Sequence, residues 1–146
     1  MTESKPSGAV WVVIPTYNEA GNIDRLIGAL LAVFSRDGID GNILVVDDGS
    51  PDGTAAIVSA RAAAAGRVSL LERHTKEGIG PAYRAGFREV LARGATLIVQ
   101  MDAEGAIERI YTGGTDRATR LEQPLDVVVG DTGDLFVIDL RRRLVR

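Results

Sequence analysis

The sequence has 146 residues, of which 17 are Lys or Arg and 20 are Asp or Glu, giving a formal net charge of −3. With 45% hydrophobic and 25% charged residues, its composition is that of a globular chain with one core. The sequence contains no cysteine, which excludes disulfides, thiolate zinc clusters and a thiol nucleophile. Because a slightly acidic chain does not present the concentrated basic face of a nucleic-acid-binding protein, we expect no nucleic-acid partner.

Membrane and export signals are weak. The longest apolar run, Leu26 to Phe34, is far shorter than the roughly 20 residues that span a bilayer. The first ten residues carry an acid and have no apolar core of the kind found in signal peptides. We therefore expect a cytoplasmic protein, with at most peripheral contact with the inner face of the membrane.

Between residues 10 and 101, apolar runs rich in Val and Ile alternate with segments of helical period. In chain order, the pattern predicts a strand at 10–14 closed by Pro15, a helix with Asn22 as N-cap that ends before Asp37, a strand at 43–46, a helix at 54–65, a strand at 68–71, a helix from Pro81 as first residue to Gly94, and a strand at 96–101. This order predicts a βαβαβαβ unit, in which right-handed crossovers give a parallel sheet.

The character of the sequence changes near Gly105. Short β segments are predicted at 107–111, 126–129, 135–138 and from 144 onward, with turns at 113–114 and 131–134. We therefore divide the chain into an α/β domain at residues 1–105 and a β-rich tail at residues 106–146.

Acidic residues follow several of the predicted parallel strands. Ligands of such sheets bind beyond the carboxyl ends of the strands. Asp102 and Glu104 follow the last of these strands, and two carboxylates with ligand phosphates are a typical site for Mg²⁺. The alternative is that they are loop acids that cap the next element. Likewise, the acids and glycines at 47–53 could form a tight turn between a strand and a helix.

Four motifs carry a family resemblance. They are VVIPTYNE at 12–19, VVDDGSPDGT at 45–54, KEGIGPAYRAGF at 76–87 and QMDAEG at 100–105. Over about residues 9–105, the chain resembles the family-2 glycosyltransferases, and within them the dolichyl- or polyprenyl-phosphate mannosyltransferases. The resemblance implies a truncated GT-A fold, which is a Rossmann-like α/β fold, followed by a short all-β tail.

The resemblance also implies a nucleotide-sugar site that uses a Mg²⁺ or Mn²⁺ ion, with GDP-mannose as the expected donor. The resemblance implies that Pro15, Tyr17 and Glu19 line the pocket for the base and ribose, and that Asp47 or Asp48 contacts the base or ribose. It implies that Asp102 and Glu104 hold the metal on the diphosphate. The metal would neutralise the charge that develops on the leaving nucleoside diphosphate. No catalytic residue is identified.

Two departures from the family pattern leave the function open. Glu104 stands where the family usually has Asp, and the motifs of the family's acceptor half do not follow Gly105. The first hypothesis is a glycosyltransferase that transfers a sugar, expected to be mannose, to a polyprenyl phosphate. The second is a metal-dependent nucleotide-diphosphate binder without turnover. The third is a non-enzymatic hybrid whose β tail makes interactions.

The tail has a resemblance of its own. The segment PLDVVVGDTGDLFVIDLRRRLVR at 124–146 resembles one NHL repeat, the blade unit of certain β-propellers. Since a propeller needs roughly four to eight blades to close, a single blade would lack its neighbours.

Overall fold

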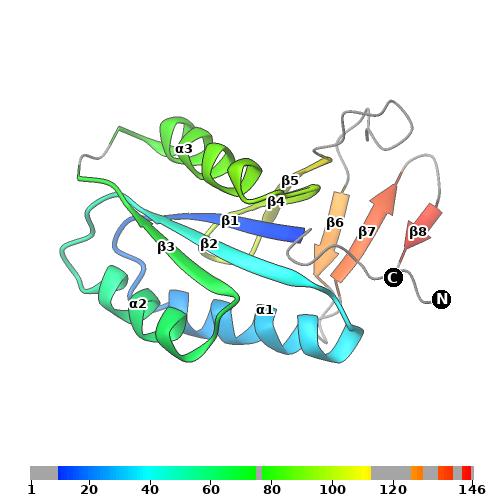
Figure 1. The fold of residues 1–146 in the computed structure, drawn as a ribbon, viewed down its shortest axis with the longest axis horizontal. Helices are drawn as coiled ribbons and strands as arrows, with labels where there is room; N and C mark the ends of the chain where they lie inside the picture. The colour runs from blue at the N-terminus through cyan, green and yellow to red at the C-terminus, as the bar shows by residue number, and fades with distance from the viewer. Residues whose placement is uncertain (1–9, 75–76, 113–125, 130–134, 140–142, 146) are drawn as a thin grey trace.

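A computed structural model describes residues 10–74, 77–112, 126–129, 135–139 and 143–145. The main body is a five-stranded sheet in the order β3-β2-β1-β4-β5, in which β5 is antiparallel to β4 and the other neighbours are parallel (Figure 1). In chain order its elements are β1 (Val10–Thr16), α1 (Ile23–Asp37), β2 (Gly41–Asp47), α2 (Thr54–Ala64), β3 (Val68–Glu72), α3 (Ile79–Ala92), β4 (Leu97–Met101) and β5 (Ile107–Thr112). The predicted α/β class, with a mostly parallel sheet, is confirmed.

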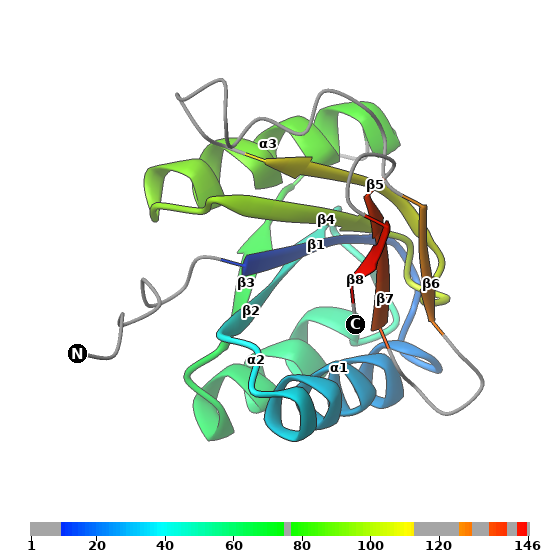
Figure 2. The ribbon, with the colours of Figure 1, turned by 90° about the vertical axis from the view of Figure 1, so that its right-hand side faces the viewer.

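Helices cover both faces of the sheet. α1 and α2 lie on one face and α3 lies on the other, as Figures 1 and 2 both show. The central strands β1 and β2 are therefore buried on both sides, and their side chains divide between two apolar clusters. This double burial explains why their sequences are continuous apolar runs and do not alternate with polar residues.

Apolar residues at spacings of three and four predict a stripe on α1 that consists of Ile23, Leu26, Ile27, Leu30, Leu31 and Phe34. The buried residues of the helix are Ile23, Ile27, Leu30, Val33 and Phe34. The helix ends at Gly38, whose left-handed φ of +63° suits a residue without a side chain. Asn22 does occupy the N-cap position, but its side chain makes no capping hydrogen bond.

Two proline positions differ from the prediction. α3 begins at Ile79, so Pro81 is its third residue and not its first. Proline is tolerated there because the first N–H groups of a helix have no intrahelical acceptor. β1 does not close at Pro15 but continues to Thr16. Its pairing with β4 covers Val10–Val13, so Pro15 lies beyond that ladder and its missing N–H costs no hydrogen bond there.

The segment at 107–111, which the sequence placed in the tail, forms β5 and pairs with β4. The remaining strands, β6 (Asp126–Val129), β7 (Leu135–Asp139) and β8 (Arg143–Val145), form a separate antiparallel sheet in the order β6-β7-β8. This sheet lies on the side of the molecule away from α2 and β3 (Figure 1). The predicted turns at 113–114 and 131–134 lie outside the described residues.

Within the described residues, no helix combines the length and the apolar character needed to cross a bilayer.

Candidate functional site

The acidic segments predicted as a site lie at one edge of the sheet. β2, β1 and β4 are neighbours and run parallel, so the loops that follow them meet at the same edge. These loops carry residues 17–22, 48–53 and 102–106. The sheet topology therefore brings together the three segments that the sequence singled out.

The loop after β2 holds the loop after β1 in place. Four hydrogen bonds to side-chain oxygens join the two segments: from Thr16 Oγ1 to Asp47 Oδ1 (2.8 Å), from the Asn18 N–H to Ser50 Oγ (2.9 Å), from the Glu19 N–H to Thr54 Oγ1 (3.1 Å) and from the Ala20 N–H to Asp52 Oδ2 (3.0 Å). The hydrogen bond from the Thr54 hydroxyl lowers the pKa of Asp52, which keeps this acceptor ionised. The segment at 47–53, which the sequence indicates could be a tight turn, therefore also supports the loop after β1.

Asp47 is buried, with 1% of its surface exposed. Besides Thr16, its carboxylate accepts hydrogen bonds from the Ser50 hydroxyl (2.6 Å) and the Ser50 N–H (3.0 Å). Both of its oxygens are therefore engaged inside the protein, and the side chain joins the ends of β1 and β2.

Asp48 is also buried, and it faces a cation that the sequence analysis missed. Its Oδ1 lies 3.4 Å from Nη1 of Arg73, and Arg73 Nη2 donates to Glu77 Oε2 at 2.8 Å. Arg73 follows β3, a strand of the same parallel sheet. The expectation that residues after the parallel strands meet at the carboxyl edge therefore applied to Arg73 as well. An arginine after a strand has no distinctive spacing, and its contact with Asp48 depends on the pairing of β2 with β3.

The predicted site residues at the end of β1 and in the loop after it differ in their exposure to solvent. Tyr17 is 38% exposed, whereas Pro15 and Glu19 are half-buried. The Glu19 carboxylate accepts a long hydrogen bond from Asn22 Nδ2 (3.3 Å), and its carbonyl accepts the N–H of Ile23 at the start of α1. Asn18, between Tyr17 and Glu19, has a left-handed φ of +56°.

Asp102 and Glu104 lie in a tight turn after β4. Asp102 Oδ1 accepts the N–H groups of Glu104 (3.0 Å) and Ala106 (2.9 Å), and Gly105 closes the turn with a φ of +94°. Glu104 is exposed. Asp102 therefore does cap its own loop, as the alternative interpretation expected, while Glu104 remains at the surface.

The donor set of this turn fits one kind of cation. Among the described residues, no group of three or more His, Cys, Asp or Glu side chains is arranged to hold a metal ion. Two carboxylates are nevertheless what Mg²⁺ uses when phosphate oxygens supply its other ligands. The residues present thus fit an ion that arrives with a diphosphate, and not an ion held by protein alone.

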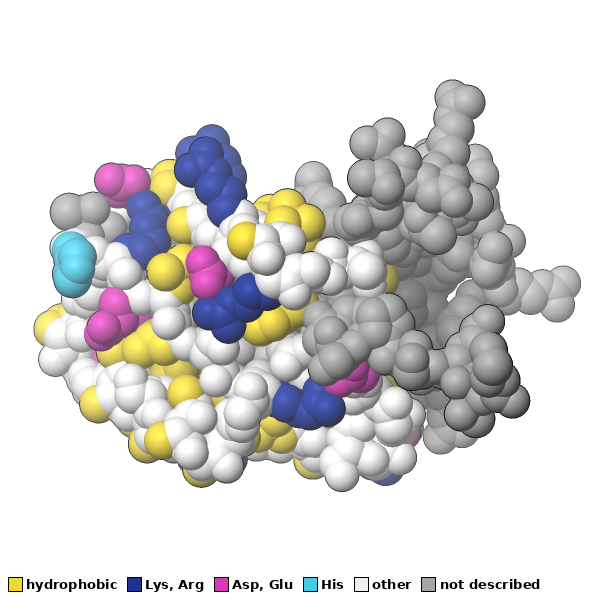
Figure 3. Space-filling view, viewed as in Figure 1, with side chains coloured by type: hydrophobic (Ala, Val, Ile, Leu, Met, Phe, Trp, Pro, Cys, Tyr) yellow, Lys and Arg dark blue, Asp and Glu magenta, His cyan; other side chains and the backbone are white. Residues whose placement is uncertain are grey.

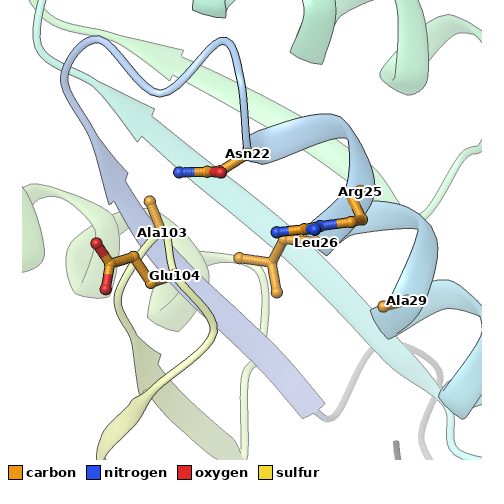
Figure 4. A pocket seen from close by; sticks show the side chains of 6 residues that line it. All are labelled: Asn22, Arg25, Leu26, Ala29, Ala103 and Glu104. Carbon is orange, nitrogen blue, oxygen red and sulfur yellow. The ribbon is translucent and has the colours of Figure 1, made fainter.

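A pocket of about 470 Å³ lies between this turn and α1. Its lining residues are Asn22, Arg25, Leu26, Ala29, Ala103 and Glu104. In Figure 4, Asn22, which directly precedes α1, and Arg25 and Leu26 of α1 extend toward the turn that carries Ala103 and Glu104. The pocket therefore adjoins both the predicted metal residue Glu104 and the start of α1.

Charges on the face seen in Figure 3 are mixed, because Lys and Arg side chains are interspersed with Asp and Glu. This arrangement differs from the concentrated basic face of nucleic-acid-binding proteins.

The structure defines an α/β protein with a mostly parallel sheet and a cluster of acidic loops at its carboxyl edge. The family described as Glycosyl transferase family 2 matches residues 11–109, and the chain belongs to this family.

The chain is 46% identical over 98 residues to an undecaprenyl-phosphate mannosyltransferase of Micrococcus luteus, a match that covers 66% of this chain and 38% of the relative. It is 43% identical over 103 residues to a polyprenol monophosphomannose synthase of Mycolicibacterium smegmatis, covering 70% of this chain and 37% of the relative. The chain thus spans less than two fifths of the length of either relative.

Among solved structures, the chain is similar to the mannosyltransferase PcManGT from Pyrobaculum calidifontis in complex with GDP-Man and Mn²⁺. The TM-score is 0.55 at 25% sequence identity, and the match covers 77% of this chain and 31% of PcManGT.

Proposed function

We propose that this chain binds a nucleoside-diphosphate sugar, with GDP-mannose as the donor, at the carboxyl edge of its parallel sheet. The observation that carries the proposal is the gathering of the loops after β1, β2 and β4 at this edge, within a chain that belongs to a glycosyltransferase family. The similarity to PcManGT, which was solved with GDP-Man and Mn²⁺, supports the choice of donor.

In this proposal, Pro15, Tyr17 and Glu19 line the base and ribose pocket. The exposed ring of Tyr17 offers an apolar face on which a base can lie, and Glu19 offers an acceptor for ribose hydroxyls. Of the two neighbouring acids, Asp48 fits the role of a base or ribose contact better than Asp47. The Asp47 carboxylate already accepts three internal hydrogen bonds, so it serves as a support.

Asp102 and Glu104 would hold a Mg²⁺ or Mn²⁺ ion together with the donor diphosphate. When bound, such an ion offsets the charge that develops on the leaving nucleoside diphosphate. Asp102 is held by its own turn, whereas Glu104 is exposed and can adjust to the ion.

The transfer that we propose moves mannose to a polyprenyl phosphate, as the names of the two bacterial relatives indicate for those proteins. An acceptor of this kind would bring the protein to the inner face of the membrane. Transfer also needs the acceptor to be positioned in line with the donor, and the chain matches less than two fifths of each relative. Donor binding without turnover is therefore the second candidate.

The first test is calorimetric titration of GDP and of UDP into the purified chain, with Mn²⁺ and with EDTA. We expect binding that prefers GDP, that is weak in EDTA and that Mn²⁺ strengthens, and we expect Asp102→Ala to abolish the gain from Mn²⁺. Asp37→Ala is the matched control, because Asp37 is an exposed acid at the opposite end of α1. Equal binding by the Asp102 variant would remove the metal role, and no binding by the wild type would overturn the donor site.

A transfer assay then separates the two candidates. Radiolabelled GDP-mannose is incubated with polyprenyl phosphate and with the chain. Formation of a labelled lipid supports the transferase, whereas metal-dependent GDP binding without any labelled lipid supports a binder without turnover.

For residues 124–146 we propose one NHL-like repeat that makes interactions, whereas residues 107–112, which the sequence assigned to the same tail, form β5 of the main sheet. The antiparallel backbone of β6, β7 and β8 supports it, because a blade is built from antiparallel strands. Size-exclusion chromatography tests the interaction role: a compact monomer whose tail is protected from proteases would count against it.

A further inference from the structure

Tyr83 lies in the motif GPAYRAGF, to which the proposed donor site gives no role. Its side chain is buried, with 5% of its surface exposed, and its hydroxyl donates a hydrogen bond to the carbonyl oxygen of Met101 at 3.2 Å. Met101 is the last residue of β4 and directly precedes Asp102. A side chain of α3 is thus attached to the strand end from which the proposed metal turn begins.

The strand pairing is irregular at Met101, whose carbonyl accepts the Tyr83 hydroxyl. Pairing of β4 with β1 ends at Gln100, and the register between β4 and β5 shifts between Gln100 and Met101. A shift of this kind interrupts the ladder and leaves backbone groups without their usual partners. The Tyr83 hydroxyl supplies this carbonyl with a buried hydrogen-bond donor, and it thereby stabilises the irregular strand end.

α3 reaches this position because it packs very close to the sheet. A Cβ atom on Gly86 would lie 2.5 Å from Val13 Cγ1 and 2.9 Å from Val46 Cγ2, so only glycine permits this approach. Tyr83 precedes Gly86 by three residues and therefore lies on the same face of the helix. The close contact at Gly86 brings the Tyr83 hydroxyl within reach of β4.

The surroundings keep this hydroxyl protonated. Burial, followed by the nearby charge of Glu108, raises the pKa of Tyr83 well above its usual value, and Asp102 adds to the effect. Tyr83 therefore remains a hydrogen-bond donor over the whole range of pH in which the protein would work.

We propose that Tyr83 is a positioning residue, whose hydroxyl fixes the end of β4 and thereby aims the carboxylates of Asp102 and Glu104 at the divalent cation of the donor complex. This inference rests on the proposed function, because it assumes that the turn holds a cation with the donor diphosphate. Mg²⁺ requires near-ideal octahedral geometry, so a small displacement of the two carboxylates weakens its binding.

The test compares the wild type with Tyr83→Phe, which removes the hydroxyl and keeps the ring. GDP affinity is measured by calorimetry at saturating Mn²⁺ and in EDTA, and the Mn²⁺ concentration for half-maximal enhancement is determined. Phe87→Leu is the matched control, because the Phe87 ring lies 5.9 Å from that of Tyr83 and its loss disturbs the packing without removing the hydroxyl.

We expect Tyr83→Phe to need roughly tenfold more Mn²⁺ for half-maximal enhancement, at the lower end of the losses seen when groups that support metal ligands are removed. Binding of GDP in EDTA should not change, and Phe87→Leu should resemble the wild type in both measurements. A merely structural role for Tyr83 would instead lower binding equally with and without the metal.

Three results would overturn the proposal. The first is a Mn²⁺ requirement within about twofold of the wild type, which is below the loss expected for a supporting group. The second is an equal loss of GDP binding in EDTA, and the third is an equal loss in Phe87→Leu. A wild type that binds GDP equally with and without Mn²⁺ would overturn the proposed metal role itself. If only Tyr83→Phe behaves like the wild type, the positioning role of Tyr83 is wrong but the metal role is not affected.

Discussion

Single residues at the carboxyl edge divide into supports and surface groups. Asp47 is buried and joins two loops, whereas Glu104 is exposed in its turn. Both are acids that follow a buried strand, so their sequence positions alone do not separate the two roles. The difference arises from the donors around each side chain, which belong to other loops.

Asp47→Ala should lower the free energy of unfolding by about 3 kcal/mol, because it removes a charged acceptor and leaves the buried hydroxyl of Thr16 and the half-buried donors of Ser50 unpaired. Urea unfolding of the two proteins measures this difference. Ser50→Ala, which removes one of the donors, should cost only about 1 kcal/mol. Equal stability of Asp47→Ala and the wild type would contradict the supporting role.

Helix faces could be predicted from the sequence, whereas strand partners could not. Most of the buried stripe of α1 was predicted, because its spacing depends only on which face meets the sheet. The buried Val33 was not included, and Leu26 and Leu31 are only half-buried. The placement of β5 was not predicted, since a short β segment does not reveal its partner and its pairing depends on the far side of β4. Arg73 was missed for the same reason, because its contact with Asp48 exists only after β3 pairs with β2.

The close approach of α3 to the sheet predicts how glycine substitutions in this helix change the stability of the protein. Gly86→Ala should lower the free energy of unfolding by about 2 kcal/mol, because the added methyl group would displace Val13 and Val46. Gly80→Ala lies in the same helix with no heavy atom within 4 Å of its Cβ, and it should raise stability by up to about 1 kcal/mol. Thermal and urea unfolding of both variants measure the difference, and a stabilising Gly86→Ala would refute the close approach.

On the scale of the whole molecule, the division of the chain at Gly105 can be tested against the pairing of β5. Ile110 of β5 is 4% exposed and belongs to the core that α1 covers. A chain that ends at Gly105 would lose this strand and uncover the edge of β4. A chain that ends at Thr112 would keep β5 and its pairing with β4, and it would lack only the separate sheet of β6, β7 and β8 and the segments that connect it.

We expect the chain that ends at Thr112 to unfold at nearly the same urea concentration as the full chain. The chain that ends at Gly105 should be less stable by at least about 2 kcal/mol, the contribution of burying one large aliphatic side chain. Urea unfolding followed by circular dichroism compares the three proteins. Equal stability of both shortened chains would favour the division at Gly105.

The order of the strands has a consequence for synthesis on the ribosome. β1 emerges before β2, β3 and β4, yet it lies at the centre of the sheet, where Val10 pairs with Leu97 of β4. The side of β1 that pairs with β4 must therefore stay open while the β2, β3 and α3 segments are translated. The turn with Asp102 and Glu104 follows β4, so the growing chain closes its central ladder and completes the acidic edge in the same late step.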